Sequence, residues 1–125
     1  MINKIITAMV VLAAIFFIVT GLRWLIDPAG IVEMFGLELA SGLGLSSQVG
    51  DMSAFFLTLG ICMLIGVVTS NATWFYPPAI LLGLTALGRT IAWLVHDASF
   101  AIDLIAPEIF VMVLLLIASR RLANN

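Results

Sequence analysis

Residues 77–96 read Pro-Pro-Ala-Ile-Leu-Leu-Gly-Leu-Thr-Ala-Leu-Gly-Arg-Thr-Ile-Ala-Trp-Leu-Val-His, and this stretch decides the fold. It has the roughly 20 mostly apolar residues that a helix needs to cross a bilayer. Arg89, however, lies well inside its apolar length. A charge at membrane depth costs a few kcal/mol or more, so such a residue normally faces a bundle interior and finds a partner. The stretch therefore predicts a membrane-spanning helix inside a bundle, and the other segments must accommodate Arg89.

The composition of the whole chain is that of a membrane protein. Of its 125 residues, 63% are hydrophobic and 10% are charged, whereas soluble domains carry roughly 25% charged residues. The mean hydropathy of +1.25 agrees, since too few polar residues exist to cover a globular surface. The net charge of −2 argues against a nucleic-acid partner. One cysteine, Cys62, lies in an apolar run, so neither a disulfide framework nor a paired-cysteine metal site is expected.

Four apolar segments are long enough to cross a bilayer. We expect spans at about 5–26, 52–69, 74–95 and 100–118. Lys4 before the first span is compatible with a signal peptide, but the apolar run is longer than a typical signal core. It also lacks a small-x-small cleavage site, which favours a retained helix. The predicted fold is all-α: a single domain over residues 1–125, built as an up-and-down bundle of four transmembrane helices.

The connection between the first two spans is the longest. Asp27 is a candidate N-cap and Pro28 suits a first helical position, so we expect a short helical segment over 28–35. Its apolar stripe would lie in the membrane surface and cover the mouth of the bundle. Residues 37–50 are rich in Gly and Ser and are interpreted as a loop. Asp51 is then expected at the start of the second span, where a helix N-terminus favours an anion.

The basic residues predict the orientation. Lys4, Arg120 and Arg121 flank the two termini, which an even number of spans places on one face. The connections on the opposite face carry acidic residues and no Lys or Arg. Because cytoplasmic segments are enriched in Lys and Arg, we expect both termini to be cytoplasmic.

Depth along the helices predicts that the polar residues meet in the outer half of the bundle. At about 1.5 Å per residue, Arg89 lies roughly 10 Å below His96, and Glu108 lies roughly 12 Å below the start of the fourth span. The two side chains should therefore sit at matched depth on neighbouring helices. The predicted ligand-binding or buried polar cluster consists of Arg23, Asp51, Arg89, His96 and Glu108.

Two stripes at helical spacing accompany this cluster. In the third span, small residues predict close contact with a neighbouring helix: they are Ala79, Gly83, Ala86 and Thr90. In the second span, polar residues share one face: they are Asp51, Thr58, Cys62 and Thr69.

Two interpretations of Arg89 and Glu108 stay open at this point. The pair can form part of a ligand or proton site, or it can fix helix register and satisfy its own charges. No Ser-His-Asp set and no Cys or His cluster occurs, so we predict no catalytic and no metal-binding residues. A binding or accessory role is favoured over an enzyme.

Several short motifs resemble those of one bacterial family. They are Gly-Asp51-Met-Ser-Ala-Phe-Phe in the second span, Leu87-Gly88-Arg89-Thr90 followed by His96 in the third, Glu108 in the fourth, Gly21-Leu22 with Asp27-Pro28, and Phe35-Gly36-Leu37. The family is a group of four-helix membrane proteins catalogued as a domain of unknown function, in the DoxX-like neighbourhood. The resemblance covers nearly the whole chain and implies a four-helix fold in a bacterial inner membrane, but no established activity. Relatives often carry an Arg near the start of the second span, where this chain has Ser53.

The leading functional hypothesis is a small integral membrane protein whose outer-half pocket, around Arg89 and Glu108, binds a lipid-soluble or anionic small molecule. No resident cofactor is predicted. A quinone or a lipid is left open as the ligand. The DoxX-like analogy supports the quinone, and this is an association only. The alternative is an accessory subunit or assembly factor of a larger membrane complex, or a homo-oligomer. A proton-coupled carrier is less favoured, because the chain lacks the internal repeat usual in transporters. Membrane lipid is the expected surrounding partner, and nucleic acid is not.

Overall fold

The computed structural model describes residues 1–122, which form helices, turns and short connections without a strand. The elements are α1 (Ile2–Ile26), α2 (Pro28–Ile31), η1 (Val32–Phe35), α3 (Gly42–Thr69), η2 (Ala72–Phe75), α4 (Tyr76–Val95) and α5 (Ile102–Arg121). Four helical segments, 2–26, 42–69, 72–95 and 102–121, are long and apolar enough to cross a membrane. The prediction of an all-α, multi-pass membrane protein with four long helices is confirmed.

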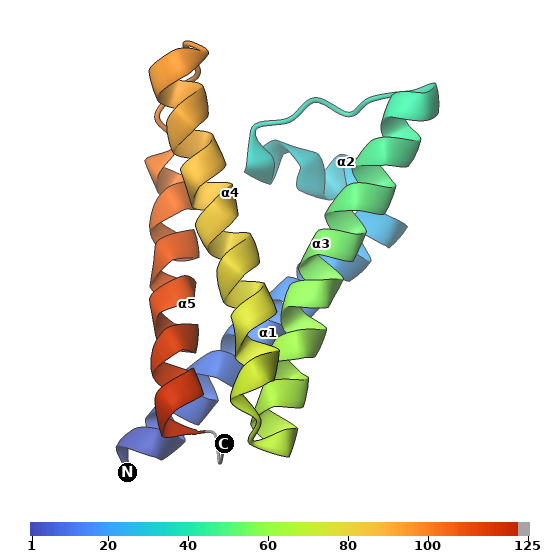
Figure 1. Ribbon diagram of the computed structural model, residues 1–125. Coiled ribbons are helices and arrows are strands. Elements are labelled where there is room, and N and C mark those ends of the chain that lie inside the picture. The colour runs from blue at the N-terminus through green and yellow to red at the C-terminus, as the bar shows by residue number, and fades with distance from the viewer. Residues whose placement is uncertain (123–125) are drawn as a thin grey trace.

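The four long helices form two pairs (Figure 1). α1 packs along α3, and α4 packs along α5, whereas contacts between the two pairs are fewer. The start of α1 and the end of α5 lie at one end of the bundle, and the two pairs diverge toward the other end, where α2 and η1 lie in the opening. The helices therefore form a bundle that is closed at the end where α1 begins and wider at the opposite end.

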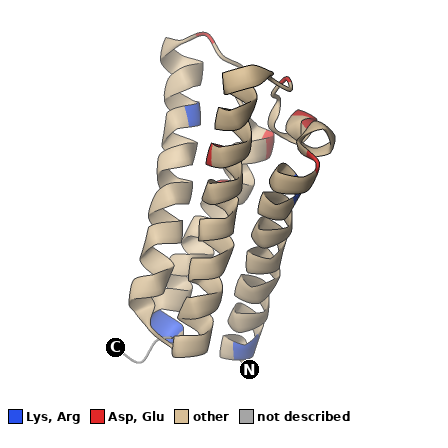
Figure 2. Cartoon of the chain, turned by 90° about the vertical axis from the view of Figure 1, so that its right-hand side faces the viewer, with Lys and Arg blue, Asp and Glu red and all other residues tan. Residues whose placement is uncertain are grey.

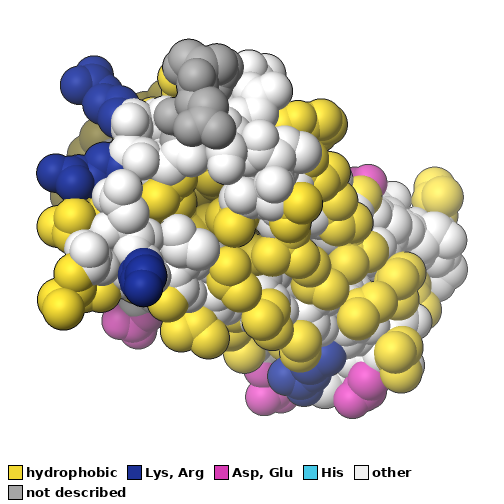
Figure 3. Space-filling view, turned by 90° about the horizontal axis from the view of Figure 1, so that it is seen from below, with side chains coloured by type: hydrophobic (Ala, Val, Ile, Leu, Met, Phe, Trp, Pro, Cys, Tyr) yellow, Lys and Arg dark blue, Asp and Glu magenta, His cyan; other side chains and the backbone are white. Residues whose placement is uncertain are grey.

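Each long helix buries one stripe and exposes the rest. On α1 the buried residues Ile6, Val10, Ala14, Phe17 and Trp24 recur every three, four or seven positions, as one helix face requires. The outward-facing residues are apolar as well, so hydrophobic side chains cover much of the surface in Figure 3. A surface with so large an apolar area is suited to lipid rather than water.

The predicted helical segment after α1 is present. The backbone N–H of Gly30 donates to Oδ1 of Asp27 at 3.2 Å, so Asp27 caps α2 as expected. Ile31 and Val32 are buried against the bundle, and η1 ends where Gly36 adopts a left-handed φ of 70°. The segment over 28–35 is therefore helical and fixed to the bundle by its apolar side.

The expected loop over 37–50 is wrong for its second part, because α3 already begins at Gly42. Nε2 of Gln48 donates to the carbonyl of Glu38 at 2.8 Å, and Oε1 of Gln48 accepts from the N–H of Ala40 at 3.0 Å. From the second turn of the helix, this side chain bonds to the backbone groups of the short connection, so a Gly- and Ser-rich sequence can remain helical. With 28 residues, α3 reaches about 42 Å at 1.5 Å per residue and exceeds the ~30 Å hydrocarbon thickness.

Charge is distributed unevenly along the bundle axis (Figure 2). Lys or Arg residues mark the end where α1 begins and α5 ends, and acidic residues occur toward the opposite end. Arg23 and Arg89 are the two basic residues placed away from the first of these ends. The asymmetry that the sequence predicts is thus preserved in three dimensions.

Candidate functional site

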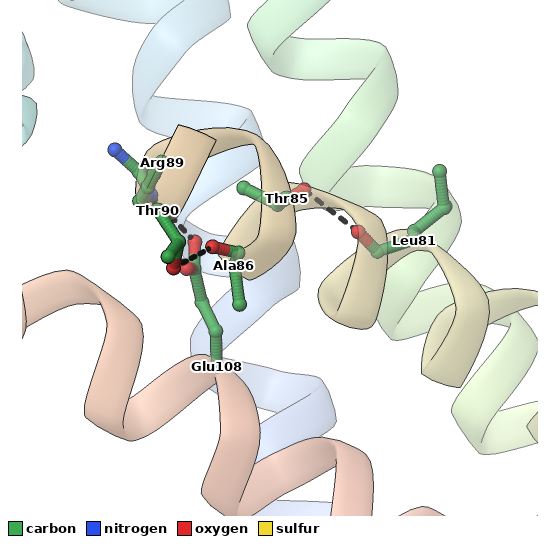
Figure 4. A network of polar contacts seen from close by, with 6 residues as sticks. All are labelled: Leu81, Thr85, Ala86, Arg89, Thr90 and Glu108. Atoms are coloured by element: carbon green, nitrogen blue, oxygen red, sulfur yellow. Dashed lines mark hydrogen bonds and ion pairs between the residues drawn. The ribbon is translucent and has the colours of Figure 1, made fainter. Parts of the chain in front are cut away.

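Arg89 on α4 and Glu108 on α5 form an ion pair (Figure 4). Nε of Arg89 lies 3.2 Å from Oε1 and 3.1 Å from Oε2 of Glu108. The side chains are 27% and 12% exposed, so the pair is only partly shielded. The contact between these two residues, predicted from their depth, is present.

The threonines beside Arg89 do not extend this pair into a network. The hydroxyl of Thr85 donates to the carbonyl of Leu81 at 2.7 Å, and that of Thr90 donates to the carbonyl of Ala86 at 2.9 Å. Both bonds stay within α4, the usual arrangement for hydroxyls inside helices. Glu108 is therefore the polar side chain that contacts Arg89 among the described residues.

The other three members of the predicted cluster lie elsewhere. Arg23 is exposed at the end of α1 and donates through a terminal nitrogen to the carbonyl of Gly30 at 3.0 Å, which holds α2 against α1. The Asp51 carboxylate and the His96 ring belong to exposed residues and have no hydrogen bond or ion pair to residues 1–122. The structure therefore joins one pair and does not assemble the predicted set of five.

The reason for the separation of Asp51 is the early start of α3. Because the helix begins at Gly42, Asp51 lies in its third turn rather than at the N-terminus where the sequence placed it. The polar stripe of α3 faces outward: Asp51, Thr58 and Thr69 are exposed and Cys62 is half-buried. That stripe is not part of an interior site.

The small-residue stripe of α4 behaves as predicted. Ala79 and Ala86 are buried, and a Cβ added to Gly83 would lie 2.9 Å from Sδ of Met112 on α5. Small side chains here allow α4 and α5 to approach closely. This close contact keeps the helix pair together one and a half turns below Arg89.

A cavity of about 210 Å³ lies beside Glu108, between the two helix pairs and η1. Five phenylalanines and three aliphatic or Met side chains form its apolar walls: Phe16, Phe17, Phe35, Phe55, Phe56, Met34, Leu82 and Leu104. The ring of Phe56 is central, with centroids 5.0 Å from Phe55, 5.2 Å from Phe35 and 6.0 Å from Phe17. We call this space the phenylalanine cavity.

The polar part of the phenylalanine cavity comes from a single turn of α5. Asp103, Pro107 and Glu108 line this side. Pro107 lies inside α5 and has no N–H, so it cannot donate to the carbonyl of Asp103, four residues earlier. The side chains on this wall that can hydrogen-bond are therefore two carboxylates, which accept when ionised. Arg89 is not among the lining residues.

The sequence predicts Glu108 as a site residue but does not predict the phenylalanines that line the cavity. A signal was present in the paired phenylalanines Phe16-Phe17 and Phe55-Phe56, one pair in each of the first two spans. In an apolar segment such pairs are not distinguishable from ordinary packing or lipid-facing residues. Only the packing of α1 along α3 shows that both pairs contribute to one cavity.

Among the described residues, no group of three or more His, Cys, Asp or Glu side chains could hold a metal ion. Comparisons with protein-family models, with curated proteins and with solved structures find no match for this chain. The likeness to the four-helix family therefore remains a prediction from short motifs. The phenylalanine cavity and the Arg89–Glu108 pair are the candidate functional features of the described residues.

Proposed function

We propose that this chain is a membrane-embedded binding protein for a lipid-soluble molecule that carries an aromatic ring. The ring would occupy the phenylalanine cavity, and its polar substituent would donate hydrogen bonds to Glu108 and to the adjoining turn of α5. The observation that carries the proposal is the composition of the walls: five phenylalanines face a wall that carries the carboxylates of Asp103 and Glu108.

The volume supports a ring-sized ligand. A cavity of about 150 Å³ lined by apolar side chains holds a benzene molecule, whereas drug-sized ligands need about 300–1,000 Å³. The phenylalanine cavity, at about 210 Å³, accommodates one substituted ring. Phenylalanine rings also suit this ligand, because stacked or edge-to-face aromatic pairs contribute about 0.5–1.5 kcal/mol beyond the area they bury.

The charges favour a neutral ligand that donates hydrogen bonds over an anionic ligand. Arg89 pairs with Glu108 and does not line the cavity, and both carboxylates that line it would repel an anionic ligand. The structure thus weighs against the anionic ligand that the sequence left open. A hydroquinone is the form of a quinone-like molecule with hydroxyl donors, and we take an alkyl hydroquinone as the probe.

Binding to the purified protein in detergent tests this proposal. We expect an alkyl hydroquinone to bind at least tenfold more tightly than the corresponding benzoquinone, which cannot donate, and than an alkyl carboxylate of equal length. Phe55→Ala, which removes one cavity wall, should weaken hydroquinone binding about tenfold, or about 1.4 kcal/mol. Phe110→Ala is the control, because Phe110 is exposed on α5 and does not line the phenylalanine cavity.

Equal loss in both phenylalanine variants, or no binding of any probe, would refute the proposed site. Copurification with a discrete partner protein, without probe binding, would instead support the alternative of an accessory subunit or assembly factor in a larger complex. A tighter complex with the carboxylate would contradict the argument from charge.

We further propose that the protein lies in a bacterial inner membrane with both termini in the cytoplasm and the phenylalanine cavity in the outer half. The basic residues near the termini and the acidic opposite end support this orientation. In a Cys62→Ala background, a membrane-impermeant thiol reagent added to intact cells should modify Gly44→Cys and spare Asn3→Cys. The reverse pattern would place the cavity in the cytoplasmic half.

A further inference from the structure

A second hollow, of about 160 Å³, adjoins the phenylalanine cavity between α1 and α5. The two spaces share four lining residues, which are Phe16, Phe17, Pro107 and Glu108. The second hollow adds Ala13 from α1 and Val111 from α5, and Glu108 is its one ionisable lining residue. We call this space the α1–α5 groove.

The outer rim of the α1–α5 groove faces the surrounding bilayer. Phe16 is 55% exposed and Pro107 is exposed, although both also line the interior space. The two helices contact each other less extensively than each contacts its own partner. Ala13 is only half-buried and small, so it leaves the floor of the groove open.

The size of the phenylalanine cavity requires such an opening if the ligand has a hydrocarbon tail. A space of about 210 Å³ holds a ring but no long chain. The tail must then leave through an apolar passage, because the wider end of the bundle is acidic. Moving a tail from lipid into an apolar groove costs little, since lipid tails are as apolar as Leu side chains.

We infer that the ligand is an amphiphile whose tail leaves sideways between α1 and α5, with Phe16 and Pro107 at the opening. This inference rests on the proposed binding function. The polar ring end lies against Glu108, the tail occupies the α1–α5 groove, and the ligand is exchanged with the membrane rather than with water.

A substitution that narrows only the α1–α5 groove separates this inference from the proposed function. Ala13→Leu adds bulk to the groove and leaves every residue of the phenylalanine cavity unchanged. Ala54→Leu is the matched control, because Ala54 is exposed on α3 and lines neither space. The probes are methylhydroquinone, which has no tail, and decylhydroquinone, with concentrations expressed as mole fractions in the detergent phase.

We expect the unaltered protein and Ala54→Leu to bind both probes. Ala13→Leu should bind methylhydroquinone within about twofold of the affinity of the unaltered protein. It should bind decylhydroquinone at least tenfold more weakly than the unaltered protein does. If Ala13→Leu binds both probes as tightly as the unaltered protein, the lateral opening is overturned and the ring site stays intact. Failure of the unaltered protein to bind either probe would refute the proposed function itself.

Photolabelling of the unaltered protein gives an answer that does not depend on the stability of a variant. A hydroquinone with a diazirine in the middle of its tail should label residues near Ala13 on α1 and Val111 on α5. Labelling confined to η1 or α3 would show that the tail leaves by the wider end of the bundle, and the inference would be wrong.

Discussion

The two helix pairs are held together by different means. α1 and α3 approach so closely that a Cβ on Gly60 would lie 2.6 Å from the carbonyl oxygen of Ala14 and 2.5 Å from Cγ1 of Ile18. Of the two glycines in α4, Gly83 makes the contact with α5, and the neighbour there is the flexible side chain of Met112. Higher up, these two helices are joined by the Arg89–Glu108 ion pair.

This difference indicates which pair can carry a site. Backbone-to-backbone contact through glycine leaves no room for a ligand and no polar group to recognise one. The α4–α5 contact places a carboxylate beside an aromatic cavity, and its ion-pair partner, Arg89, does not line that cavity. We therefore interpret α1 and α3 as the rigid wall, and α4 and α5 as the side that recognises the polar end of the ligand.

The largest loss of stability at either helix pair should come from breaking the Arg89–Glu108 ion pair. Arg89→Gln or Glu108→Gln leaves the remaining charge without its partner in a low-dielectric setting, which costs about 3–5 kcal/mol when a pair is fully buried. Because the two side chains are 27% and 12% exposed, we expect a loss near 3 kcal/mol, the lower end of that range. Thermal or denaturant unfolding in detergent measures it.

The double variant, Arg89→Gln with Glu108→Gln, should lose much less stability than the two single losses combined. Additive losses would show that the two side chains do not interact. Hydroquinone binding then distinguishes a purely structural ion pair from a ligand-binding one, because Glu108 lines the phenylalanine cavity and Arg89 does not. Recovered stability with binding weakened about tenfold would place recognition at Glu108, since a charged acceptor forms the stronger hydrogen bond. Recovered stability with unchanged binding would limit the pair to a structural role.

An intermediate effect is expected at the α1–α3 contact. Gly60→Ala must push α1 away, because the nearest atoms include the backbone of Ala14, and overpacking of this kind costs about 1–3 kcal/mol. Gly50→Ala in the same helix is the control: nothing lies within 4 Å of its added Cβ, so reduced chain entropy should stabilise it by about 0.5–1 kcal/mol. Equal unfolding temperatures for both variants would contradict the close approach of α1 and α3.

The sequence was sufficient to predict that there are four long helices and that Arg89 contacts Glu108. Hydropathy specifies four long apolar segments, and the rise per residue brings Arg89 to the depth of Glu108 without knowledge of any side-chain packing. The cap at Asp27 was also predictable, because its geometry depends on residues within one helical turn.

The remaining features depend on contacts that no local pattern specifies. The start of α3 at Gly42 depends on Gln48 reaching back to Glu38 and Ala40, and helix propensity alone favours a loop over this Gly- and Ser-rich stretch. The predicted cluster failed for Arg23 because a backbone carbonyl, at Gly30, satisfies it locally. Matching depth establishes that residues can meet, but it does not establish which way each side chain faces.

The smallest effect on stability is expected at the glycine contact of α4 with α5, where two glycines of α4 can be compared. At Gly88 an added Cβ meets open space, so Gly88→Ala should stabilise the protein by about 0.5–1 kcal/mol through reduced chain entropy. At Gly83 the same gain is offset, because the added Cβ lies 2.9 Å from Sδ of Met112 and this side chain must move. We expect Gly83→Ala to change the free energy of unfolding by less than about 0.5 kcal/mol, since a flexible Met adjusts at low cost. Equal stabilisation by both variants would mean that α4 and α5 are not in close contact at Gly83. A loss of more than about 1 kcal/mol at Gly83 would mean that Met112 is held as rigidly as a backbone atom, and the α4–α5 contact would then resemble that of α1 and α3.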